Sequence, residues 1–278
     1  DVQDAIVAEV SRVVGTLNRY PDREFTGLRR ALAGYLGHGL TADHVWAGNG
    51  SNEILQQILQ AFGGPGRTLL SFLPSYSMYP LLAGGTDTVF VDGGRAADHT
   101  LSAEHAADQV RRHRPHVVFL ASPNNPTGTA LEDDVVDAVY RAGEESNTVV
   151  VVDEAYAEFS RFPERTALRL LEGRPRLVVS RTMSKAFDFA GGRLGYFVAA
   201  PAFIEAVMLV RLPYHLSAVT QATAEAALDH VDALLRTVED IKAQRDRIVS
   251  TLRGLGLRPS VSDSNFVFFG HLEDASDV

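Results

Sequence analysis

Residues 178–195, read V-V-S-R-T-M-S-K-A-F-D-F-A-G-G-R-L-G, contain the side chains with the clearest chemistry in the sequence. Lys185 follows Ser184 directly, while Thr182 precedes the lysine and Arg193 follows it in the same stretch. Hydroxyl groups and a guanidinium can hold a phosphate, and a lysine amine can form a Schiff base with an aldehyde. The stretch therefore fits an aldehyde cofactor that carries a phosphate, although an isolated Ser-Lys pair is more often part of an exposed loop.

A second group of phosphate donors is expected at G-N-G-S-N-E, which follows a short apolar strand and opens a helix. There the backbone N–H groups of Gly50, Ser51 and Asn52 would point, with the helix dipole, toward an anion. The motif is neither of the glycine-rich nucleotide loops, G-x-x-x-x-G-K-[ST] and G-x-G-x-x-G. An ordinary helix cap formed by Ser51 or Asn52 is the alternative.

Two loops could hold a flat ring. The loop P-S-Y-S-M-Y-P, residues 74–80, offers Tyr76 and Tyr79 as aromatic faces, although aromatic residues here are more often part of the core. The loop S-P-N-N-P-T-G, residues 122–128, follows an apolar strand and is restricted by its two prolines. Because open α/β sheets bind ligands at strand ends, Asn125 could hydrogen-bond a ring hydroxyl there.

A carboxylate ends the apolar strand in V-V-V-V-D-E-A-Y. Asp153 would lie at the end of a buried strand, where an ionised carboxylate needs a partner. A protonated pyridine nitrogen would supply one, and Tyr156 could reach the same ring from the following turn. The acidic strand end of a helicase-like ATPase is the competing interpretation, but it requires a phosphate loop with G-K-[ST], which the sequence lacks.

Short apolar strands alternate with helices along most of the chain, which predicts that these groups meet at one edge of one sheet. A short strand is expected before the glycine turn, and further strands at 68–72, 86–91, 116–120, 148–153, 176–180, 195–199 and 265–269. Helices are expected at 3–17, 26–36, 52–62, 102–113, 131–145, 202–211 and 217–255, the last interrupted or bent near Asp229. Strands that are apolar on both faces are typical of a mainly parallel sheet covered by helices, so the predicted fold class is α/β.

Helices dominate after Pro201, which indicates a second, smaller unit. We expect an N-terminal helix at 1–19 that associates with this smaller unit, a large cofactor-binding domain at 20–212, and a small α+β domain at 213–278. The chain does not begin with Met, and we expect sequence to be missing at both ends. The small domain is therefore expected to be incomplete.

The composition limits the class of protein. The 278 residues are 45% hydrophobic with a formal net charge of -9, which suits a large packed core and argues against broad binding to nucleic acid or an anionic membrane. There is no cysteine, which excludes disulfides, thiolate metal sites and cysteine nucleophiles, and we expect no metal site. No apolar run approaches the roughly 18 residues of a membrane span. These features fit a reducing cytoplasm.

The order of motifs resembles the fold type I aminotransferases that use pyridoxal 5'-phosphate (PLP), and is most similar to histidinol-phosphate aminotransferases. The motifs are N-R-Y-P, G-N-G-S-N-E, P-S-Y-S-M-Y, S-P-N-N-P-T-G, V-V-V-D-E-A-Y and S-R-T-M-S-K-A-F-x-x-A-G-x-R-x-G. They run over nearly the whole chain. The resemblance implies a cytoplasmic enzyme of histidine biosynthesis that acts on small molecules.

The resemblance also implies roles for single residues. Lys185 would hold the cofactor as a Schiff base and later move the proton between the substrate Cα and the cofactor C4'. Asp153 would pair with the pyridine nitrogen, Asn125 and Tyr156 would hold the ring O3', and Tyr76 would stack on the ring. The residues expected around the cofactor phosphate are Gly50, Ser51, Asn52, Thr182, Ser184 and Arg193.

Tyr20 is expected to reach the cofactor phosphate of a partner subunit, so the resemblance implies a homodimer with shared active sites. The family's arginines that bind the anionic group of the substrate would lie beyond Val278. The loop R-L-P-Y-H-L-S, residues 211–217, resembles a substrate-side loop of the family. Tyr214 and His215 are given no catalytic role, because packing explains them at least as well.

The reaction implied is the transfer of an amino group from L-histidinol phosphate to 2-oxoglutarate, which gives imidazole-acetol phosphate and L-glutamate. An aromatic amino-acid aminotransferase and a threonine-phosphate decarboxylase are alternatives on the same scaffold. A PLP-sensing domain of a transcription regulator is an alternative of another class, and would require an attached DNA-binding domain.

Overall fold

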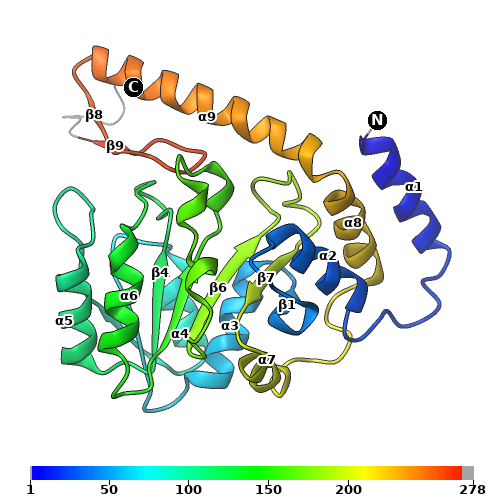
Figure 1. Cartoon of the computed structure of the whole chain (residues 1–278), viewed down its shortest axis with the longest axis horizontal. Coiled ribbons are helices and arrows are strands. Elements are labelled where there is room, and N and C mark those ends of the chain that lie inside the picture. The colour runs from blue at the N-terminus through cyan, green and yellow to red at the C-terminus, as the bar shows by residue number, and fades with distance from the viewer. Residues whose placement is uncertain (1, 271–278) are drawn as a thin grey trace.

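The computed structural model describes residues 2–270 of the 278-residue chain, and a seven-stranded sheet covered by helices forms its centre (Figure 1). The strand order is β1-β7-β6-β5-β4-β2-β3. The strands are β1 (Val45–Gly48), β2 (Thr68–Ser71), β3 (Val89–Asp92), β4 (Val117–Ala121), β5 (Val149–Asp153), β6 (Leu177–Thr182) and β7 (Gly195–Val198). The predicted α/β class and mainly parallel sheet are confirmed.

The central strands β4, β5 and β6 are buried along their whole lengths, as their apolar sequences predict. They run parallel, whereas β7 runs antiparallel to both β6 and β1. The register pairs Asp153 with Ala121 on one side and Ser180 on the other. Because parallel strands end at the same edge, the loops after β4, β5 and β6 must meet beside Asp153.

Nine α-helices surround the sheet in the described part of the chain, and most lie where the hydrophobic pattern predicts them. The helices are α1 (Val2–Val14), α2 (Thr26–Leu36), α3 (Ser51–Phe62), α4 (Met78–Gly85), α5 (Ala103–His113), α6 (Asp133–Ala142), α7 (Pro201–Met208), α8 (Ala218–Asp229) and α9 (Val231–Gly254). The long helix expected at 217–255 is two helices that meet at His230, so the interruption expected near Asp229 is present.

Three local predictions are wrong. Helix α4 is not among the expected helices; Pro80 lies in its first turn, where the missing N–H costs no helical hydrogen bond. Strand β3 begins at Val89 rather than at 86, since Asp87 adopts a positive φ of 54° in a turn. Of the strand expected at 265–269, only Phe269 belongs to a strand; β9 (Phe269–Gly270) pairs with β8 (Arg258–Pro259).

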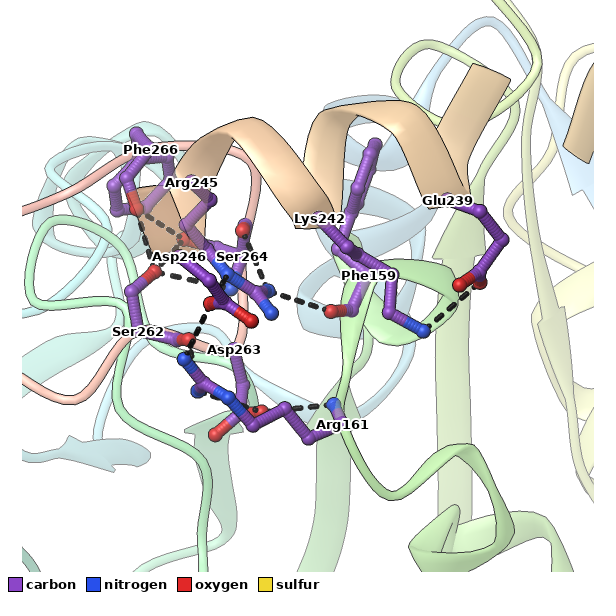
Figure 2. A network of polar contacts seen from close by, with 10 residues as sticks. All are labelled: Phe159, Arg161, Glu239, Lys242, Arg245, Asp246, Ser262, Asp263, Ser264 and Phe266. Atoms are coloured by element: carbon purple, nitrogen blue, oxygen red, sulfur yellow. Dashed lines mark hydrogen bonds and ion pairs between the residues drawn. The ribbon is translucent and has the colours of Figure 1, made fainter. Parts of the chain in front are cut away.

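A polar network joins α9 to residues 159–161 and 262–264 (Figure 2). The buried Arg245 of α9 donates from Nη1 to the carbonyl oxygens of Phe159, at 2.8 Å, and Ser264, at 3.1 Å. Arg161 donates from Nη2 to Asp246 at 2.7 Å, and its backbone N–H donates to Asp263 at 2.9 Å. Helix α9 therefore contacts the short 3-10 turn that directly follows the end of β5.

The N-terminal helix α1 packs beside α8 (Figure 1). The association of 1–19 with a small domain stays a prediction. The division into domains at 20–212 and 213–278 stays a prediction.

Candidate active site

A cavity of about 190 Å³ opens at the edge of the sheet where β4, β5 and β6 end. It collects most of the residues that the sequence singled out, although they are spread over more than half the chain. The predicted residues that line it are Ser51, Asn52, Tyr76, Asn125, Asp153, Tyr156, Thr182, Ser184, Lys185 and Arg193. Tyr79, Ala121, Pro123, Ala155 and Ala190 complete the lining.

Asp153 forms the floor of this cavity and is only 6% exposed. Its Oδ2 accepts a hydrogen bond from Tyr79 Oη at 2.9 Å, and its Oδ1 accepts one from Ser180 Oγ at 3.1 Å. Burial raises the pKa of Asp153, while these two hydrogen bonds act in the opposite direction. A buried carboxylate that faces a cavity fits a protonated ring nitrogen, which would supply the missing positive charge.

Asn125 and Tyr156 lie together on one side of the cavity. Asn125 Nδ2 donates to Tyr156 Oη at 3.3 Å, and both side chains line the cavity. Burial, together with the nearby charge of Asp153, raises the pKa of Tyr156, so its hydroxyl stays protonated. An amide and a phenol at this position can hold a ring oxygen by hydrogen bonds.

The amine of Lys185 lies 5.7 Å from the centre of the Tyr156 ring. The lysine lies in the segment after β6, and β6 pairs with β5, which carries Asp153 at its end. The primary amine therefore lines the same cavity as Asp153 and Asn125. Such an amine can bind an aldehyde carbon and exchange protons with it.

Tyr76 is half-buried and lines the cavity opposite the sheet loops. Its Oη donates to Asn52 Oδ1 at 3.1 Å, and its ring packs edge-on against Tyr79 at 5.5 Å between centroids. The hydrogen bond and the edge contact fix the orientation of the ring, as a stacking role requires.

The expected phosphate donors gather at the start of α3. Gly50 precedes the helix with a φ of 87°, and the first N–H groups of α3 belong to Ser51 and Asn52. These groups have no partner within the helix and carry its positive dipole end. A Cβ on Gly195 would collide with the backbone of Gly50 and Ser51, so β7 approaches this turn closely because residue 195 is glycine.

Arg193 and the hydroxyl groups of Thr182 and Ser184 also line the cavity. Arg193 donates from Nη1 to the carbonyl oxygen of Ala190 at 3.0 Å, and its Nη2 lies against Gly50. Ser184 donates its backbone N–H to Thr182 Oγ1 at 3.1 Å, which holds both hydroxyls near the cavity. A guanidinium, two hydroxyls and a helix N-terminus are groups that can hold a phosphate.

Two predicted residues do not line the cavity. Gly50 lies immediately beside it, under Arg193. Tyr20 is 82% exposed and stacks on Tyr214, with 4.7 Å between ring centroids. His215 packs against Trp46 at 5.7 Å and donates from Nε2 to Ala47 O at 2.9 Å, in agreement with the packing interpretation.

Tyr79 and Ser180 contact Asp153 but were not assigned to it from the sequence. The sequence offers Tyr79 only as an aromatic face in the same loop as Tyr76, and nothing local in the sequence relates it to Asp153. Ser180 could have been found from the sheet register, which places it opposite Asp153.

Two further observations concern residues 2–270. No group of three or more His, Cys, Asp or Glu side chains is arranged to hold a metal ion. No helix in this range combines the length and the apolar character needed to cross a membrane.

The whole chain, residues 1–278, matches the family Aminotransferase class I and II. A histidinol-phosphate aminotransferase from Paenarthrobacter aurescens (strain TC1) is 66% identical over 278 residues, which cover 100% of this chain and 75% of that relative. The histidinol-phosphate aminotransferase from Thermobifida fusca (strain YX) is 55% identical with the same coverage. The crystal structure of histidinol-phosphate aminotransferase from Sinorhizobium meliloti in complex with pyridoxal-5'-phosphate is 30% identical, has a TM-score of 0.87, and is matched over 98% of this chain and 73% of that one.

The fold, the cavity and the family match together define an aminotransferase of class I and II. Within that class, the chain belongs to the histidinol-phosphate aminotransferase family, given its identity of 55–66% to the two relatives above. The family predicted from the motifs and the predicted enzyme class are therefore confirmed.

Proposed function

We propose that the cavity binds PLP and that the chain transfers the amino group of L-histidinol phosphate to 2-oxoglutarate, a step of histidine biosynthesis. One observation carries the proposal: a single cavity brings Lys185 together with the buried Asp153 and with Arg193 at the start of α3. The amine, the carboxylate and the phosphate donors match the aldehyde, the ring nitrogen and the phosphate of one molecule. The products are imidazole-acetol phosphate and L-glutamate.

When bound, PLP supplies an electron sink for the electron pair left at the substrate Cα. Asp153 keeps the ring nitrogen protonated, and Asn125 with Tyr156 orients the ring through its oxygen. With PLP bound, Lys185 would hold it through its amine, and the same amine would move the proton between the substrate Cα and C4'.

The phosphate donors at the start of α3 and Arg193 anchor the other end of the cofactor, so the ring stays in register with Lys185. Tyr76 covers one face of the ring. The same residues then act in reverse order when 2-oxoglutarate enters, which makes the cycle ping-pong.

Steady-state kinetics with the PLP-loaded enzyme test the substrate. With 2-oxoglutarate as acceptor, we expect kcat/KM for L-histidinol phosphate to exceed that for L-phenylalanine. We also expect the enzyme not to decarboxylate threonine phosphate. A clear preference for phenylalanine would support the aromatic aminotransferase instead. Carbon dioxide release from threonine phosphate would support the decarboxylase.

We also propose that two copies of the chain form the active unit. Exposed apolar side chains gather along the segment after α7 and at Tyr20: Leu209 is 87% exposed, Leu212 75%, and Tyr214 stacks on Tyr20. A second copy that covers these side chains would bring Tyr20 to the partner's phosphate site. Light scattering should show a dimer that Leu212→Asp weakens, whereas Leu255→Asp, at an exposed leucine after α9, should leave it intact.

We further propose a cytoplasmic location, which the family's role in biosynthesis and the absence of cysteine from the sequence support. Fractionation of the expressing cells would test it. The units 20–212 and 213–278 are proposed as the two domains, joined near the exposed Leu212, and limited proteolysis should cut first in this segment.

A further inference from the structure

The carboxylate of Asp153 is held by two hydroxyl donors, one on each oxygen. Tyr79 Oη lies 2.9 Å from Oδ2, and Ser180 Oγ lies 3.1 Å from Oδ1. Both donor residues are fully buried, so water does not compete for these hydrogen bonds. The backbone N–H of Ala155 also donates to this carboxylate, and the acceptor capacity that remains can face the cavity.

Tyr79 can act only as a donor toward this carboxylate. Burial, and then the negative charge of Asp153, raise the pKa of Tyr79 well above the ordinary value for tyrosine, so the phenol stays protonated. A neutral phenol that donates to a carboxylate favours its charged form.

The ring of Tyr79 is fixed from two sides. It packs edge-on against Phe119 of β4, at 5.1 Å between centroids, and against Tyr76, at 5.5 Å. Tyr79 lies in the first turn of α4, which is rigid because Pro80 follows directly. One short segment therefore contacts both the residue proposed to stack on the cofactor ring and the residue proposed to hold its nitrogen.

We propose that Tyr79 is a positioning residue that keeps Asp153 ionised and directed at the ring nitrogen of bound PLP, with Ser180 in a supporting role on the other oxygen. This inference rests on the proposed function. Without the phenol, the buried carboxylate loses one hydrogen-bond donor, and its neutral form becomes more favourable. A less fully ionised carboxylate then pairs less strongly with the pyridinium nitrogen. The effect must therefore depend on that nitrogen.

The test compares two ligands that differ only at this atom: PLP, and a carbocyclic analogue with CH in place of the ring nitrogen. Dissociation constants are measured for the cofactor-free chain, for Tyr79→Phe, and for the control Tyr140→Phe, a buried tyrosine on α6 that packs on Arg176. Tyr79→Phe should weaken PLP binding about tenfold and leave the analogue within about twofold, as expected for one hydrogen bond to a charged group. Tyr140→Phe should change neither constant.

Equal weakening for PLP and the analogue would mean that Tyr79 only fills space, and unchanged binding of both would mean that it has no role; either result overturns the inference. If Tyr79→Phe fails to fold, Ser180→Ala provides a second test. It removes the other hydroxyl donor to Asp153, and it should weaken the binding of PLP more than the binding of the analogue. If the unmodified chain fails to bind PLP, the proposed function itself is overturned. If the unmodified chain binds PLP more tightly than the analogue but Tyr79→Phe changes neither dissociation constant, the proposed function stands and only the role of Tyr79 is refuted.

Discussion

The guanidinium of Arg193 occupies the space in which residue 50 would carry a Cβ, so glycine at this position is what allows the two to touch. Gly50 has a φ of 87°, in the region that favours glycine, and it directly precedes α3. Arg193 itself has a φ of 53° and comes from the loop between β6 and β7. The contact unites the cation with the N–H groups that open the helix.

Gly50→Ala should therefore weaken the binding of PLP without unfolding the chain. The new Cβ would push Arg193 away from the start of α3, and the loss of a charge-assisted contact predicts a dissociation constant about tenfold higher. Fluorescence titration with PLP measures it. Gly34→Ala is the matched control: it lies in α2 with free space around its Cα and should leave PLP affinity unchanged.

Lys185→Ala should abolish covalent attachment of the cofactor and reduce turnover by about 10²–10⁴-fold or more, because the amine also moves the proton. The sequence contains one other lysine, Lys242, which pairs with Glu239 on α9 at 2.9 Å. Borohydride reduction followed by peptide mass analysis should place the cofactor on Lys185. The variant Lys242→Ala should still carry the reduced cofactor on Lys185 and should have normal turnover. Cofactor found on Lys242 of the unaltered chain would contradict the assignment.

Asp153→Asn should stabilise the cofactor-free chain at neutral pH. Burial raises the pKa of Asp153 in the folded state, so the folded chain binds this proton more tightly than the unfolded chain does. The ionised carboxylate therefore costs stability above its folded pKa, and the cost disappears as the pH falls below the unfolded value of about 3.9.

Thermal unfolding of the cofactor-free chains from pH 8 to pH 4 measures this difference. Asp153→Asn should melt higher than the original chain at pH 8, by about 2–4 °C for each kcal/mol recovered, and the two should converge toward pH 4. Asp108→Asn, at an exposed aspartate on α5, is the control and should change little at any pH. A lower melting temperature for Asp153→Asn at pH 8 would rule out this account.

Removing one partner of the buried Arg181–Glu154 pair should strongly lower the free energy of unfolding. Arg181 Nη2 lies 2.8 Å from Glu154 Oε2, and both side chains are buried. Burial lowers the pKa of Arg181, but the carboxylates of Glu154 and Glu158 outweigh it and raise the pKa, so the guanidinium stays charged.

Arg181→Met leaves the Glu154 carboxylate buried without its cation and should cost about 3–5 kcal/mol in urea unfolding. Arg111→Met breaks an exposed pair with Asp108 and should cost less than about 1 kcal/mol. A loss in Arg181→Met as small as in the exposed control would show that the pair is not structurally important. Since Glu154 follows Asp153 and Arg181 precedes Thr182, Arg181→Met should also weaken PLP binding.

Much of the fold could be predicted from the sequence because the relevant signals are local. The apolar runs that became β4, β5 and β6, and the helical spacing that became α2 and α3, depend only on neighbours along the chain. Helix α4 could not be predicted in this way, because Pro80 can follow a loop or lie in the first turn of a helix, and packing decides between them.

By itself the sequence determined the α/β class, the family and the chemical types available at the strand ends, since motifs and hydrophobic periods are properties of short segments. Only the tertiary structure decided which of these groups touch. Tyr79 and Asp153 are 74 residues apart in the sequence, and Arg193, in the loop between β6 and β7, contacts Gly50. Such contacts follow from the strand order, which differs from the order along the chain, and from close approaches that only glycine permits.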